Sequence, residues 1–130
     1  MRIMMAAAMA AALAGPAMAQ DAPPFFANTL PSQSVGPILE GYGALRGEGA
    51  ALDAKTSELI ALAVAAQIPC EYCVYAHAKN ARSAGATEAE LREAVATAGM
   101  VRLFSTALHG AAYDLEAFKT EHDAVAPPIN

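Results

Sequence analysis

The sequence predicts an all-α fold, and three observations support this prediction. Alanine is the best helix former and a poor source of buried area, and it supplies 34 of the 130 residues. Helix-capping signals recur ahead of apolar stretches with helical spacing. No run alternates apolar and polar residues for long enough to indicate a strand. We therefore expect a small bundle of closely packed helices built around an antiparallel helix hairpin.

The charge balance and composition exclude several classes of partner. The chain has 8 Lys and Arg against 13 Asp and Glu, a formal charge of −5. An acidic balance without a basic cluster argues against nucleic acid or an anionic membrane surface as the partner. With no Trp and 6% aromatic residues, a stacking platform for bases is not expected. No apolar run approaches the roughly 18 to 20 residues of a membrane span.

Residues 1–19 have the pattern of a secretory signal peptide. Arg2 gives a positive start, and Ile3–Ala14 is an uncharged apolar stretch that ends at a Gly-Pro break. Ala17–Ala19 has the small-x-small spacing of a cleavage site. We expect an exported protein in an oxidising compartment, the bacterial periplasm. The alternative is a cytoplasmic protein whose translation starts at Met18.

After the signal peptide, we expect an arm over residues 20–37, a helical domain over residues 38–125 and a tail over residues 126–130. The arm has four prolines and no periodicity, so an extended conformation is predicted. In the domain, Asp53 is a good N-cap, Gly85 occupies a left-handed helix-closing position, and Thr87–Glu90 is a capping box. The expected helices span about 38–47, 54–67, 70–84, 88–105 and 107–122.

A CxxC pair opens the third of these helices. Cys70 and Cys73 follow Pro69, and His77 comes four residues after Cys73. Positions i, i+3 and i+7 share one stripe of a helix, so both sulfurs and the imidazole lie on the same side. Unpaired N–H groups and the positive dipole end at a helix start stabilise a thiolate, and a histidine one turn further on can take or relay a proton. This is the layout of a redox dithiol with an acid–base partner.

Glu58 places a carboxylate on the apolar face of the preceding helix, beside Leu62 and Ala65. It either reaches into water at the edge of that face or is held in a cleft with a tuned pKa. Glu58 lies about ten residues before the turn and His77 about eight after it. In an antiparallel hairpin their axial levels differ by only about 3 to 4 Å. Glu58, Cys73 and His77 can therefore face one another.

Other interpretations of the cysteine pair compete with the redox one. A structural disulfide is natural in the periplasm, but a four-residue loop yields only about 2 kcal/mol, against about 3 for fifteen residues. Cys70, Cys73, His77 and Glu58 form an unusual set of zinc ligands. Two inert core thiols would not need this spacing. The residues also leave open which cysteine attacks, because helix position favours Cys70 and proximity to His77 favours Cys73.

The segment Leu52–Leu91 resembles the AhpD-like alkylhydroperoxidase / carboxymuconolactone decarboxylase family. The spacing of Glu58, Cys70, Cys73 and His77, with eleven, two and three residues between them, is that of its peroxidase branch. The resemblance implies an all-helical core that forms trimers or hexamers and reduces hydroperoxides. It implies that Cys73 attacks and becomes a sulfenic acid, that Cys70 resolves it as a disulfide, and that Glu58 and His77 relay the proton.

Two departures qualify the resemblance. Tyr72 stands where some members have a histidine, so a second imidazole in the relay is missing. An exported member would also lack the cytosolic lipoyl-type reductant and would need another thiol donor. The decarboxylase branch generally lacks the cysteine pair, so ring-lactone decarboxylation is not expected.

We therefore expect a cysteine-based peroxidase, with no cofactor and no metal, that reduces organic hydroperoxides or hydrogen peroxide with an external thiol. The alternatives are an exported thiol–disulfide oxidoreductase, a carboxymuconolactone decarboxylase-like protein of other activity, and a non-enzymatic zinc-binding helical oligomer. Limited core area and an arm that needs a surface favour a homo-oligomer, a trimer or hexamer by the resemblance. Arg102 is a candidate for pairing with a carboxylate across a subunit interface.

Overall fold

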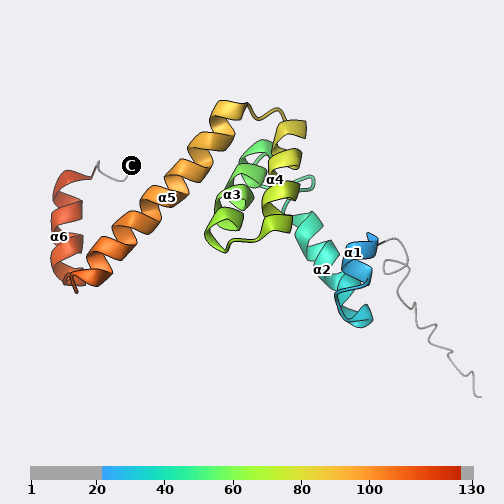
Figure 1. The fold of residues 1–130 in the computed structure, drawn as a ribbon, viewed down its shortest axis with the longest axis horizontal. Helices are drawn as coiled ribbons and strands as arrows, with labels where there is room; N and C mark the ends of the chain where they lie inside the picture. Colours follow the sequence, from blue (N-terminus) through green and yellow to red (C-terminus); the bar gives the residue numbers. More distant parts are fainter. Residues whose placement is uncertain (1–21, 127–130) are drawn as a thin grey trace, which may run out of the picture. The chain divides into compact units, whose positions relative to one another are not determined.

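The computed structural model describes residues 22–126, and every regular element in that range is an α-helix, which confirms the all-α prediction. The chain divides into two units, the first ending at Ala50 and the second beginning at Ala51. The expected signal peptide and the last four residues of the expected tail lie outside the described residues. The helices are α1 (Pro24–Ala27), α2 (Ser32–Ala44), α3 (Ala54–Gln67), α4 (Glu71–Ser83), α5 (Glu88–Gly110) and α6 (Leu115–Val125) (Figure 1).

The expectation of an extended arm over residues 20–37 is wrong, because α1 and most of the first half of α2 lie within it. The prolines sit where helices tolerate them: Pro24 is at the first position of α1, and Pro31 is the N-cap of α2. Pro37 lies inside α2. A proline normally disfavours helix at the preceding residue by a clash with its Cβ, but that residue is Gly36. The helix therefore starts at Ser32 rather than at Ile38.

In the second unit, side chains cap the N-terminus of each helix. Asp53 accepts the backbone N–H of Thr56 at 2.8 Å and opens α3, which spans the predicted residues 54–67. Thr87 and Glu90 form the predicted capping box of α5. Asp114 caps α6 by accepting the N–H of Ala117 at 2.8 Å. These bonds satisfy backbone donors that a helix start leaves unpaired.

The core of this unit lies where α3, α4 and the first part of α5 meet (Figure 1). Leu62, Ala81 and Leu91, one from each helix, form a buried cluster, and the partly buried Leu59, Ala78 and Ala86 pack against it. The predicted antiparallel hairpin is formed by α3 and α4, joined by the short turn at Ile68 and Pro69.

The turn from α4 to α5 is closed by the predicted glycine. Gly85 has a φ of +87°, its N–H donates to the carbonyl of Arg82, and the N–H of Ala86 donates to the carbonyl of Ala81. This pair of bonds is the Schellman motif. Two ion pairs add to it: Arg82 with Glu88 across the turn, and Lys55 of α3 with Glu90 of α5 at 2.7 Å.

The predicted break near residue 106 is wrong, because α5 continues to Gly110 and α6 begins only at Leu115. The hydroxyl of Thr106 donates to the carbonyl of Arg102 at 2.9 Å, so this polar residue bonds back along the helix instead of ending it. A second Schellman motif closes α5, with Ala112 at a φ of +48°. Among residues 22–126, no helix combines the length and apolar character needed to cross a membrane.

Candidate redox site

The buried face of α3 positions Glu58. Glu58 is 6% exposed, so the interpretation in which its carboxylate reaches into water is wrong. The Oε2 atom of Glu58 lies 2.7 Å from Nδ1 of His77 on α4. The hydrogen bond between these helices is the contact expected from counting residues across the hairpin. Burying a carboxylate is costly unless it is paired, and the imidazole supplies a partner in the same low-dielectric space.

The turn between α3 and α4 positions Cys70. Its backbone N–H donates to the carbonyl of Ala65 at 3.1 Å, which ties the turn to the last residues of α3. Cys70 has an extended backbone conformation and is the N-cap residue of α4. Its Sγ accepts the backbone N–H of Cys73 at 3.2 Å. A sulfur thus takes the place that a serine or aspartate oxygen usually holds at a helix start.

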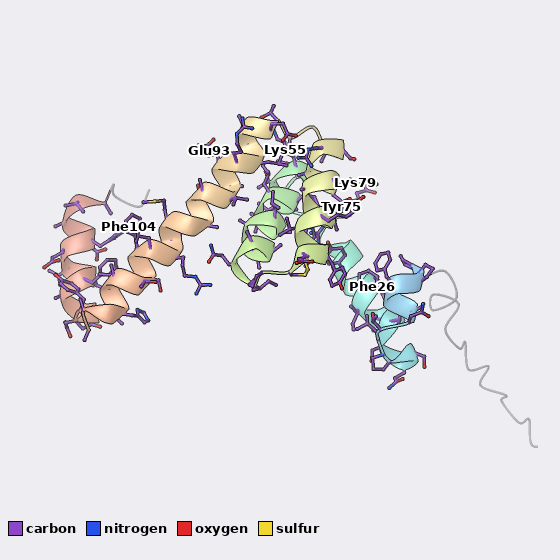
Figure 2. All side chains as sticks on the ribbon, viewed as in Figure 1. Phe26, Lys55, Tyr75, Lys79, Glu93 and Phe104 are labelled. Carbon is purple, nitrogen blue, oxygen red and sulfur yellow. A yellow bond between two sulfur atoms is a disulfide. The ribbon has the colours of Figure 1, made fainter. Side chains whose placement is uncertain are left out.

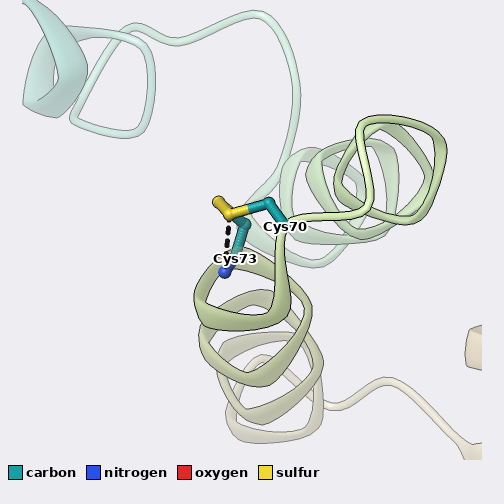
Figure 3. The surroundings of a disulfide bond; sticks show 2 residues. All are labelled: Cys70 and Cys73. Carbon is teal, nitrogen blue, oxygen red and sulfur yellow. Dashed lines mark hydrogen bonds between the residues drawn. A yellow bond between two sulfur atoms is a disulfide. The ribbon is translucent and has the colours of Figure 1, made fainter.

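Cys70 and Cys73 form a disulfide in this structure, with their Cα atoms 5.2 Å apart (Figure 3). Figure 3 shows the bond lying directly on the first turn of α4, with the N–H···S hydrogen bond beside it. Both cysteines are half-buried. The two sulfurs are thus close enough to form and break a bond without movement of the helix, and half-burial leaves them partly accessible to a reagent.

His77, the hydrogen-bond partner of the buried carboxylate, lies on the same helix as Cys73. It follows Cys73 by four residues on α4, and side chains at that spacing are neighbours on one face of a helix. With Nδ1 bonded to Glu58, Nε2 is the ring nitrogen available for proton transfer. The arrangement can therefore move a proton at a point one helical turn from the disulfide.

The surroundings of the disulfide include exposed aromatic side chains. Tyr72 and Tyr75 of α4 are 87% and 71% exposed. Figure 2 shows Tyr75 and Lys79 on the side of α4 turned away from α3. Two hollows lie elsewhere in the second unit: one borders Arg82 and Leu91, and another lies between α5 and α6 beside Phe118. The candidate site is described by its bonded and hydrogen-bonded residues.

The geometry also bears on the alternatives for the cysteine pair. The interpretation of the cysteines as two inert core thiols is wrong, because their sulfurs are bonded to each other and both residues are half-buried. Within residues 22–126, no group of three or more His, Cys, Asp and Glu side chains is arranged to hold a metal ion. Every buried side-chain nitrogen and oxygen in that range has a hydrogen-bond partner.

Sequence reasoning missed one contact that supports the site. Arg102 of α5 donates from Nε to the side-chain oxygen of Gln67 at 2.8 Å, and from a terminal nitrogen to the Gln67 backbone carbonyl at 3.2 Å. The cation thus lies at the C-terminal end of α3, where the helix dipole favours it, just before the turn that leads to Cys70. Arg102 remains a candidate for pairing with a carboxylate across a subunit interface, and within this chain its partner is the Gln67 amide. No short motif joins residues 35 positions apart.

Two uncharacterised bacterial proteins are similar to parts of this chain. An uncharacterised protein of Haemophilus influenzae is 58% identical over 47 residues, which is 34% of this chain and 42% of that protein. "Uncharacterized protein 4 in cox locus" of Paracoccus denitrificans is 43% identical over 63 residues, 48% of this chain and 51% of that protein. The chain thus spans about half the length of these curated relatives, or less.

A family model matches a larger part of the chain. The model of the carboxymuconolactone decarboxylase family matches residues 38–115, which is more than half of the sequence. The match includes α3, α4 and α5, and with them Glu58, both cysteines and His77. With the all-helical fold and the cysteine pair at disulfide distance, this match shows that the chain belongs to the carboxymuconolactone decarboxylase family.

Proposed function

We propose that this protein is a thiol-dependent peroxidase that reduces organic hydroperoxides or hydrogen peroxide through Cys70 and Cys73. The main support is the part-buried hydrogen bond between Glu58 and His77, which holds an acid–base group one helical turn from Cys73. A disulfide that served only to brace the fold would need no such group, and its four-residue loop would contribute only about 2 kcal/mol.

In the proposed oxidation, the thiolate of Cys73 attacks one oxygen of the peroxide. The O–O bond breaks, the sulfur becomes a sulfenic acid, and the departing alkoxide or hydroxide takes a proton from His77, whose charge Glu58 balances. The thiolate of Cys70 then attacks the Cys73 sulfur and displaces hydroxide, which leaves as water after protonation. The products are an alcohol or water, a second water and the Cys70–Cys73 disulfide. An external dithiol returns two electrons to close the cycle.

Serine variants of the two cysteines test this assignment through peroxide consumption with a dithiol reductant. We expect Cys73→Ser to abolish turnover, because the attacking sulfur is gone. Cys70→Ser should still react once with peroxide, and its unresolved sulfenic acid should over-oxidise to a sulfinic acid, visible as a mass gain of about 32 Da. Normal turnover by Cys73→Ser would overturn the assignment.

A thiol–disulfide oxidoreductase acting on protein substrates is the second candidate. The observation that favours it is the N-cap position of Cys70, because an N–H bond to sulfur at a helix start stabilises a thiolate and makes it a good leaving group. Rates with a disulfide peptide and with an organic hydroperoxide separate the two candidates. A much faster reaction with the peptide would favour the second.

We also propose that the protein is exported and self-associating. The signal-peptide pattern of residues 1–19 supports export into the periplasm, and exposed apolar side chains on α5 support association. In an exported enzyme the reductant is a dithiol of that compartment. Fractionation of cells that express the full chain, with detection of a shortened product outside the cytoplasm, tests the first point.

A further inference from the structure

The two sulfurs of the disulfide have different surroundings. Cys70 Sγ accepts a backbone N–H from the first turn of α4, whereas Cys73 sits inside that turn as its third residue. The backbone N–H of Cys73 therefore donates to the Cys70 sulfur. A helix start offers unpaired N–H groups and a positive dipole end, and both favour negative charge on the atom that caps it.

We propose that the reductant bonds to Cys73 and that Cys70 is the sulfur released as a thiolate when the disulfide opens. This inference rests on the proposed function only in taking the pair as redox-active. The sulfur that leaves faster in thiol–disulfide exchange is the one whose thiol has the lower pKa. Cys70 has the N–H donor needed for that role already in place, so its release requires no proton transfer.

The step balances as follows. A thiolate of the dithiol reductant attacks Cys73 Sγ, a new S–S bond forms, and the electron pair of the old bond stays on Cys70 Sγ. The second thiolate of the reductant then attacks the reductant sulfur that is bonded to Cys73. The mixed disulfide breaks, and Cys73 leaves and takes a proton. The reductant becomes a disulfide, and the protein returns to a Cys70 thiolate and a Cys73 thiol, whose proton passes to His77 before Cys73 attacks the next peroxide.

The charged groups around the turn set the background for this difference. Glu71 follows Cys70 and is exposed, so its charge is screened by water. Glu58 of α3 is hydrogen-bonded to His77, which shares one face of α4 with Cys73. Arg102 of α5 donates to Gln67, the last residue of α3. None of these groups replaces the direct N–H bond to the Cys70 sulfur. The hydrogen bond therefore distinguishes the two cysteines.

The first test measures the two thiols separately in the full chain. In Cys73→Ser only Cys70 remains, and in Cys70→Ser only Cys73 remains. Serine at position 70 is itself a good N-cap, so α4 should be retained, which circular dichroism checks. We expect the pH profile of alkylation by iodoacetamide to give Cys70 a pKa below about 8.5, the ordinary value, and at least about one unit below that of Cys73. The reverse order would overturn the proposal.

The second test uses the oxidised protein with both cysteines present. Brief treatment with 2-mercaptoethanol, a quench with N-ethylmaleimide and peptide mapping show which sulfur holds the small thiol. We expect a severalfold excess of the adduct on Cys73 with maleimide on Cys70, and the opposite excess or equal amounts would contradict the proposal. Neither test uses peroxide, so failure of peroxide reduction would remove the proposed function while leaving this inference standing.

Discussion

Glu58 pairs its carboxylate with the imidazole of His77 across the α3–α4 hairpin, which offsets the cost of burying its charge. Its place on an apolar helix face indicated an unusual carboxylate, and the length of the hairpin put it level with His77. The sequence could not decide between a buried and a solvated carboxylate, because periodicity does not fix the rotation of one helix against its neighbour. The structure gives a buried carboxylate with a 2.7 Å bond to the imidazole.

The first prediction concerns this pair. Glu58→Gln keeps the size and a hydrogen-bonding oxygen, but removes the charge that balances a protonated His77. We expect the rate of disulfide formation with a hydroperoxide to fall by about 10²-fold, the lower end of what acid–base groups contribute. Stopped-flow measurement on the reduced protein checks this. An unchanged rate, with unchanged helicity, would remove Glu58 from the proposed proton relay.

At the scale of elements, the capping residues were the most predictable features. Asp53, Gly85 and the Thr87–Glu90 box all close or open helices as predicted, because each bonds to backbone within a few residues. The failures lie where a local signal was overridden. Pro37 did not start α2, because Gly36 before it has no Cβ, and Thr106 did not end α5, because its hydroxyl bonds to the carbonyl of Arg102.

The second prediction uses the two Schellman motifs as a matched pair. Gly85 and Ala112 both have positive φ, at +87° and +48°. A Cβ added to Gly85 would meet no atom within 4 Å, so the cost of Gly85→Ala is purely conformational, about 1 kcal/mol. Ala112→Gly should stabilise the fold by about 0.5 kcal/mol. It relieves the same backbone strain, although glycine also raises the entropy of the unfolded chain. Urea unfolding should show opposite shifts in the midpoint, and shifts of the same sign would contradict this account.

The third prediction is a pH dependence set by the contact between α3 and α5. The ammonium of Lys55 and the N–H of Thr87 lower the pKa of Glu90 from 4.5 to about 2. A carboxyl with a lower pKa in the folded state stabilises the fold above its ordinary pKa, and the contribution is lost as pH falls toward 2. Glu90→Gln, which can still accept in the capping box, should therefore flatten the fall in stability between about pH 4.5 and 2.

Glu93→Gln is the matched control for that experiment, because Glu93 is an exposed carboxylate on the same helix (Figure 2). Urea unfolding midpoints at several acid pH values would compare the three proteins. The account requires that Glu90→Gln, and not Glu93→Gln, reduce the acid dependence of stability. Equal slopes in all three proteins would show that the contact between Lys55 and Glu90 does not contribute.

At the scale of the whole molecule, the buried core of the second unit is small. It consists of Leu62, Ala65, Ala81 and Leu91 with the carboxylate of Glu58. Large apolar side chains along the second half of α5 remain exposed, because the buried cluster takes from α5 only Leu91, in the first part of that helix. Composition predicted this shortage of core, since alanine buries little area, but it could not show which helix presents the exposed surface.

The fourth prediction is that the full chain self-associates through this part of α5. The resemblance described in the sequence analysis also implies trimers or hexamers. Val101, Leu103 and Phe104 are each more than half exposed. Val101→Glu would place a charge in the proposed contact, so we expect sedimentation velocity to show a smaller species than for the unaltered chain. A monomeric unaltered chain at micromolar concentration would contradict this prediction.

The central claim is that Cys70 and Cys73 form a peroxide-reactive pair, and one measurement tests it most directly. The reduced full chain receives one equivalent of an organic hydroperoxide, and intact mass is recorded with thiol trapping before and after. The account predicts that both alkylation sites disappear and that the untrapped mass falls by about 2 Da, as an intramolecular disulfide forms. Two thiols that remain trappable after long exposure would contradict it.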